Sequence, residues 1–90
     1  MDERKFSLKG NYVLREIAGE FLAVPVGAEN GAQMIVLNPV SALIWKELST
    51  EKTLEELVVA VKENFDVSQG EAAVDIMEFL AQLESYGCLN

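Results

Sequence analysis

The sequence predicts an α+β domain in which a three-stranded antiparallel sheet is followed by three helices (βββααα). Two observations support this. Segments rich in β-branched and aromatic residues with period-two patterns lie before Asn38, whereas segments with an apolar period of about 3.6 residues lie after it. The chain has 90 residues, of which 50% are hydrophobic, which suits one small folded domain over residues 1–90.

The three predicted strands occupy residues 11–17, 20–26 and 33–37. Ala18-Gly19 separates the first two strands, and the turn dipeptide Asn30-Gly31 precedes the third. Short connections favour an antiparallel meander, in which the second strand is central. Because proline removes a donor from the hydrogen-bond ladder, Pro25 is expected at the end of its strand or at a bulge.

Asn38-Pro39 predicts an abrupt change from strand to helix. Asparagine is a good N-cap residue and proline suits the first helical position, so the first helix is expected over about 39–48. Its expected buried stripe consists of Val40, Leu43, Ile44 and Leu48, with Trp45 flanking it.

Two capping boxes predict the remaining helices. Thr53 with Glu56 begins a helix over about 54–65, and Ser68 with Glu71 begins one over about 69–86 that ends before Gly87. The first nine residues are expected to be loosely held. The expected buried faces are Leu54, Leu57, Val58, Val61 and Phe65 in the second helix, and Ala72, Ala73, Ile76, Phe79, Leu80, Leu83 and Tyr86 in the third.

The composition argues against catalysis. The chain has no histidine, and Cys88 is its single cysteine, so neither a Ser-His or Cys-His pair nor a cysteine–histidine zinc site can be assembled. Cys88 is expected to act as a small semi-buried hydrophobe. The carboxylates fall at helix starts or on solvent-facing positions. The sequence therefore predicts a protein that is not an enzyme and has no cofactor or metal.

The charge argues against nucleic-acid and membrane partners. Seven basic and fifteen acidic residues give a net charge of −8, which phosphates repel. A winged-helix DNA-binding protein is therefore disfavoured, since the third helix carries acidic residues and no lysine or arginine. No apolar run approaches the length of a membrane span, and the charged N-terminus lacks the apolar core of a secretory signal. We expect a cytoplasmic protein.

Two features of the sequence suggest a binding surface. The third strand is apolar and lies at an edge of the predicted sheet, where a helix, a second copy or an added peptide strand would have to cover it. Val74, Met77 and Ala81 widen the apolar face of the third helix, as a wide core face or as the wall of a groove. If this helix lies beside the third strand, the two features form one groove for an extended peptide.

The order and spacing of four segments resemble the PqqD-like proteins, which are RiPP precursor-peptide recognition elements. The segments are YVLREIAGEFLAVPVG, IVLNPVSALIWKEL, TLEELVVAVKENFDVS and AAVDIMEFLAQLESYGCL. The resemblance covers about residues 11–89 and rests on order and spacing, not on one invariant motif. It implies a winged-helix-like domain of three strands and three helices. It also implies that the leader of a ribosomally made precursor peptide adds as a strand to the third strand and lies against the third helix. The bound leader would be presented to a modifying enzyme, often a radical S-adenosylmethionine protein.

Carried to this sequence, the resemblance implies a set of peptide-binding residues on one strand and one helix. A basic leader residue would suit Asp75 or Glu78, and the namesake pathway is pyrroloquinoline quinone synthesis. The alternatives are a structural docking subunit and a homodimeric module without peptide binding. The implied residues are Gln33, Met34, Ile35, Val36 and Leu37 on the strand, and Val74, Asp75, Met77, Glu78 and Ala81 on the helix.

Overall fold

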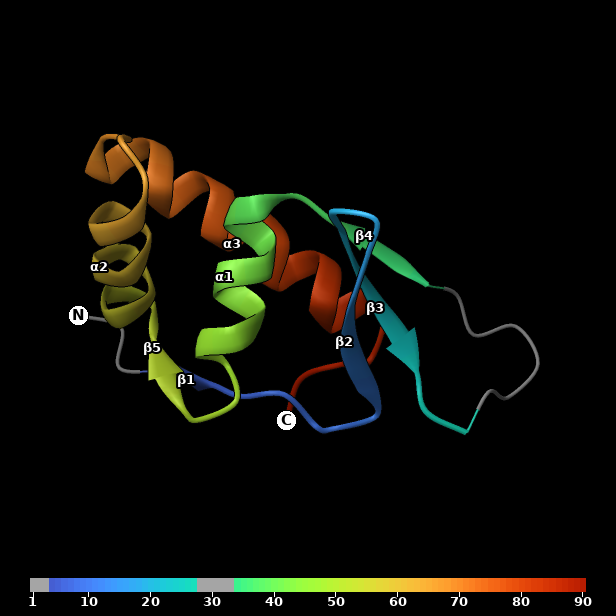
Figure 1. Cartoon of the computed structure of the whole chain (residues 1–90). Helices are drawn as coiled ribbons and strands as arrows, with labels where there is room; N and C mark the ends of the chain where they lie inside the picture. The colour runs from blue at the N-terminus through green and yellow to red at the C-terminus, as the bar shows by residue number, and fades with distance from the viewer. Residues whose placement is uncertain (1–3, 28–33) are drawn as a thin grey trace.

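The computed structural model describes residues 4–27 and 34–90. Helices gather on one side of the molecule and an antiparallel sheet of order β2-β3-β4 lies on the other (Figure 1). The predicted α+β class and the βββααα order of the main elements are confirmed. The elements are β2 (Tyr12–Ile17), β3 (Glu20–Pro25), β4 (Ile35–Leu37), α1 (Pro39–Glu47), α2 (Leu54–Asn64) and α3 (Gln69–Ser85).

The sheet follows the predicted meander. β3 is central, and Pro25 is its last residue, followed by one more hydrogen bond from the Val26 N–H to the Asn11 carbonyl at 2.9 Å. Ala18 and Gly19 both have positive φ, 52° and 82°, which is the backbone required at the centre of a two-residue type I′ hairpin turn. The Asn30-Gly31 dipeptide lies outside the described residues.

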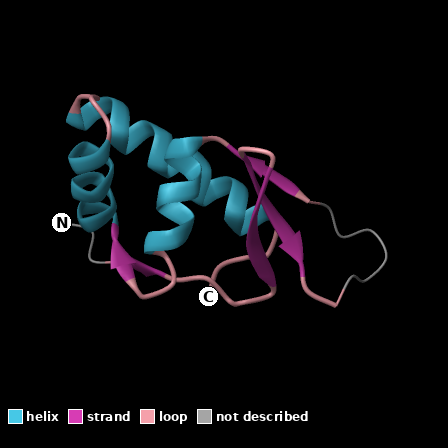
Figure 2. Ribbon diagram, viewed as in Figure 1, coloured by secondary structure: helices cyan, strands magenta, loops and turns pink. Residues whose placement is uncertain are grey.

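The structure adds a second, two-stranded sheet that the sequence analysis did not predict (Figure 2). It pairs β1 (Lys5–Phe6) with β5 (Lys52–Thr53) in antiparallel register. Phe6 is only 9% exposed, and the Lys9 N–H donates to the Cys88 carbonyl at 2.8 Å. Residues 4–9 are therefore packed against the domain, contrary to the expectation that the first nine residues are loosely held.

All three predicted N-caps are present. The Asn38 side chain accepts from the Ser41 N–H at 2.8 Å. In the α2 box, the Thr53 N–H donates to Glu56 at 2.9 Å and the Glu56 N–H donates back to the Thr53 hydroxyl at 3.2 Å. Ser68 and Glu71 repeat the arrangement at the start of α3. Each helix start thus satisfies otherwise unpaired N–H groups within its own sequence.

Acidification should weaken both capping boxes. The backbone N–H of Thr53 lowers the pKa of Glu56, and that of Ser68 lowers the pKa of Glu71, from the ordinary value of 4.5. A carboxyl whose pKa is lowered by folding stabilises the fold above its unfolded pKa, and this contribution is lost as the pH falls through its folded pKa. The Tm difference between the wild type and Glu56→Ala/Glu71→Ala should therefore shrink on acidification.

Circular dichroism melts from pH 7 down to pH 3 would measure this Tm difference. Glu63→Ala is the control, because Glu63 lies on α2 outside both boxes. A Tm difference that stays constant over the whole pH range would contradict the assigned cause.

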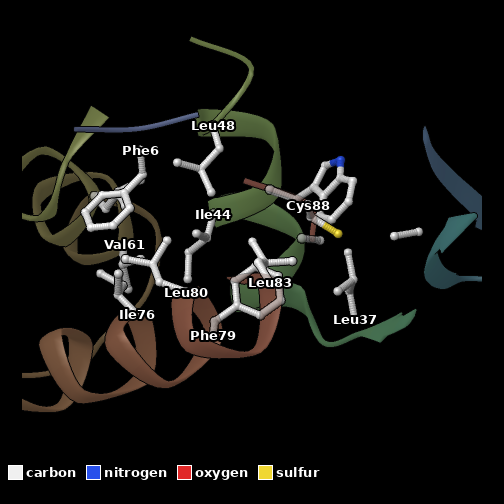
Figure 3. Packing of buried hydrophobic residues seen from close by; sticks show 14 of the residues in the cluster. Phe6, Leu37, Ile44, Leu48, Val61, Ile76, Phe79, Leu80, Leu83 and Cys88 are labelled. Carbon is white, nitrogen blue, oxygen red and sulfur yellow. The ribbon is translucent and has the colours of Figure 1, made fainter. Parts of the chain in front are cut away.

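The core joins the helices to the inner face of the sheet (Figure 3). On α1 the buried side chains are Ala42, Ile44 and Trp45, whereas Val40 and Leu43 are only partly buried. The predicted α1 stripe is thus confirmed for Ile44 and Leu48 and holds in part for Val40 and Leu43, which pack against the core, and Trp45 belongs to the core. The physical reason is that α1 contacts both β4 and α2, so more than one side of the helix is covered. The Tyr12 ring of β2 also packs edge-on against the Trp45 ring, with 6.4 Å between the ring centroids.

The buried faces of α2 and α3 largely match the prediction. Leu57, Val58 and Val61 are buried on α2, whereas Leu54 and Phe65 at its ends are partly buried. On α3, Ala73 is partly buried and Tyr86, just past the end of the helix, is 37% exposed. Cys88 is buried rather than semi-buried. The remaining predicted α3 residues, Ala72, Ile76, Phe79, Leu80 and Leu83, are buried.

Candidate functional site

The edge of β4 is the first part of the candidate site. β3 pairs with one side of β4, and within residues 4–27 and 34–90 no strand pairs with its other side. Ile35 and Leu37 point into the core at 2% and 5% exposure, while Val36 is 71% exposed. Met34, just before β4, is also exposed, and Gln33 lies outside the described residues. An edge strand of this kind offers backbone N–H and C=O groups to an added strand.

A cavity of about 260 Å³ begins where β4 ends. We call it the α1–α3 cavity, because the start of α1 and the middle of α3 form it. Asn38, the residue directly after β4, belongs to its lining, so the strand edge and the cavity are continuous along the chain. The lining residues are Asn38, Val40, Ser41, Ile44, Asp75, Glu78, Phe79 and Gln82.

The predicted helix residues do not all face this cavity. Met77 and Ala81 line a different cavity of about 210 Å³, together with Arg4 and Phe6 from the N-terminal segment. Successive residues of an α-helix are about 100° apart, so Met77 and Ala81 lie on one flank of α3, and Asp75 and Glu78 lie toward the other. Val74 is exposed and shares the flank of Met77 and Ala81. The two cavities do not bring all five residues together, and one groove lined by all five stays a prediction.

The α1 contribution to the cavity is the part that sequence reasoning missed. Val40 and Ile44 were expected only in the core, and Asn38 only as a cap. The Asn38-Pro39 dipeptide could have indicated this contribution, because it makes α1 begin directly after the end of β4. The side on which α3 crosses that start depends on tertiary packing.

Asp75 and Glu78 give this cavity an acidic rim. The other two acidic residues of α3 are engaged, since Glu71 closes the capping box and Glu84 forms an ion pair with Arg4 at 3.0 Å. Within residues 4–27 and 34–90, the side chains of Asp75 and Glu78 have no hydrogen bond and no ion pair. Both are exposed, whereas Ile44 and Phe79 at the base of the cavity are buried.

Two further findings concern other kinds of site. Among the described residues, no three histidine, cysteine, aspartate or glutamate side chains gather closely enough to hold a metal ion. In that same part of the chain, no helix has both the length and the apolar character needed to cross a membrane.

Comparison with known proteins identifies the family. The family model for Coenzyme PQQ synthesis protein D (PqqD) matches residues 9–89. The chain belongs to the PqqD family. This match confirms the resemblance that the four sequence segments indicated. Among curated proteins, no sequence matches this PqqD-family chain significantly.

A solved structure supports the fold of this PqqD-family protein. It is the structure of TbiB1 in complex with the TbiA(beta) leader peptide, with a TM-score of 0.75 and 23% sequence identity. The match covers 93% of this chain and 94% of that chain. At this level of identity the likeness shows that the two chains share a fold.

Proposed function

We propose that this protein is a non-catalytic adaptor that binds the leader of a ribosomally synthesised precursor peptide and presents it to a modifying enzyme. The observation that carries the proposal is the open edge of β4, which is followed directly by Asn38 in the lining of the α1–α3 cavity. Membership of the PqqD family supports it, and so does the leader peptide bound to the structurally similar TbiB1. A radical S-adenosylmethionine maturase is the class of modifying enzyme that the family suggests.

The leader binds as an added strand. Its backbone pairs with the β4 edge, Ile35–Leu37 and the residues just before it, and this pairing gives affinity without reading sequence. Side chains on one face of the added strand meet α3 at Asp75 and Glu78, and those on the other face lie beside exposed Val36. In this arrangement Val74, Met77 and Ala81 lie on the far flank of α3 and remain available to the modifying enzyme.

An NMR titration tests the proposal. The ligand is a synthetic peptide with the sequence of a precursor leader, added to ¹⁵N-labelled protein. The amide signals of Ile35–Leu37 should shift together with those of Asp75 and Glu78, and the signal of Met77 should move least. Shifts centred on Met77, or saturating peptide without any shift, would overturn the proposal.

A homodimer that pairs through β4 would be distinguished by its self-association in the absence of peptide. Sedimentation velocity over a range of protein concentrations should show a single monomeric species if the edge serves a peptide. Association without peptide, accompanied by broadening at Val36, would instead assign the edge to self-pairing.

A further inference from the structure

We propose that the leader carries a lysine or arginine whose side chain enters the α1–α3 cavity and pairs with Asp75 and Glu78. This inference rests on the proposed function and adds a specificity subsite to it. Strand pairing along β4 accepts any sequence, so the side chain that fills this cavity would select the leader.

The composition of the cavity fits a long cationic side chain. Its base is apolar, with Ile44 and Phe79 buried and Val40 partly buried, and its rim carries two carboxylates. Lysine and arginine combine an apolar stem with a charged end, so the stem would cover the base while the charge reaches the rim. An apolar side chain would cover the base and leave the carboxylates without a partner.

The local electrostatics favour a cation over an anion. The start of α1 contributes a partial positive charge of about half a unit at the cavity, which Asn38 already caps. Asp75 and Glu78 together outweigh it with two full negative charges, and neither has an ion-pair partner in the described part of the chain. The net charge of −8 also attracts a basic peptide.

The register of β4 indicates which position of the bound leader carries the lysine or arginine. Ile35 and Leu37 face the helices and Val36 faces away, so leader residues alternate in the same manner. The cation belongs to the helix-facing set, at the end of the added strand that lies near Leu37 and Asn38. Residues of the opposite set lie beside Val36, which favours apolar side chains there.

Fluorescence anisotropy with labelled synthetic leaders tests the subsite. At each basic position of the bound segment, lysine or arginine is replaced by norleucine and by glutamate. At one helix-facing position, norleucine should raise Kd roughly tenfold and glutamate should raise it further. The Asp75→Lys/Glu78→Lys variant should reverse this order and prefer glutamate.

Glu55→Lys/Glu63→Lys is the matched control, because it makes the same change in net charge on α2, away from the cavity. This control variant should keep the wild-type preference for the basic residue. Equal affinity for the lysine, norleucine and glutamate leaders would overturn the subsite while the adaptor function stands. A bound segment without any basic residue would also overturn it, and a leader that does not bind at all would overturn the proposed function itself.

Discussion

Leu83→Ala should lower the free energy of unfolding by about 3–5 kcal/mol, the range found when a buried leucine leaves a cavity. Leu83 is 0% exposed and lies among Ile44, Phe79 and Cys88, where α1 and α3 meet the C-terminal segment (Figure 3). A domain of 90 residues is expected to have a total stability of about 5–13 kcal/mol. The variant should therefore lose a large share of its stability.

Urea denaturation followed by circular dichroism measures this loss as a lower midpoint with an unchanged slope. Met77→Ala is the matched control, because Met77 lies on the same helix but is 57% exposed. Its free energy of unfolding should stay within about 0.5 kcal/mol of the wild type. Equal losses in the two variants would mean that the buried face of α3 is not where the structure places it.

Local signals account for the part of the fold that could be predicted. Asn38, Thr53 and Ser68 each begin a helix through a hydrogen bond to a residue three positions later, so a short stretch of sequence determines each start. Pro25 similarly marks a strand end because it lacks a donor. These features depend on neighbours in the chain and little on the rest of the molecule.

The parts that could not be predicted depend on distant contacts. β1 and β5 are two residues each, too short for any periodic pattern, and they lie far apart in the sequence. Trp45 is buried in part because Tyr12 of β2, which is distant from it in the sequence, packs against it. Backbone hydrogen bonds to Leu48 and Cys88 hold residues 4–9 in place. Nothing in the sequence of those six residues predicts these bonds.

The candidate site shows the same division. β4 was predicted as an apolar edge because its composition and its place in the meander are local properties. The sequence indicated α3 as the second wall of the groove, but a helical pattern alone does not tell which flank faces the strand. Tertiary packing turns Asp75 and Glu78 toward the start of α1, and it turns Met77 toward Arg4 and Phe6.

Methylation of single backbone nitrogens along the leader should weaken its binding with a period of two residues. In an added strand, the N–H groups of every second residue point toward β4 and the others point away. A methyl group on an inward nitrogen removes a hydrogen bond and holds apart strands that must approach to about 4.8 Å. Each inward methylation should raise Kd by at least roughly tenfold.

The outward methylations serve as controls, since they add the same group to the same peptide without facing the strand. Isothermal titration calorimetry over the whole series would give the affinity of each peptide. Large losses at almost every position would indicate a helical leader, because each interior N–H of a helix bonds within the helix, and uniform small losses would indicate recognition by side chains alone. Only the period-two pattern agrees with pairing along Ile35–Leu37. It shows which backbone N–H groups of the leader face β4, and it does not depend on the side chains that the leader carries.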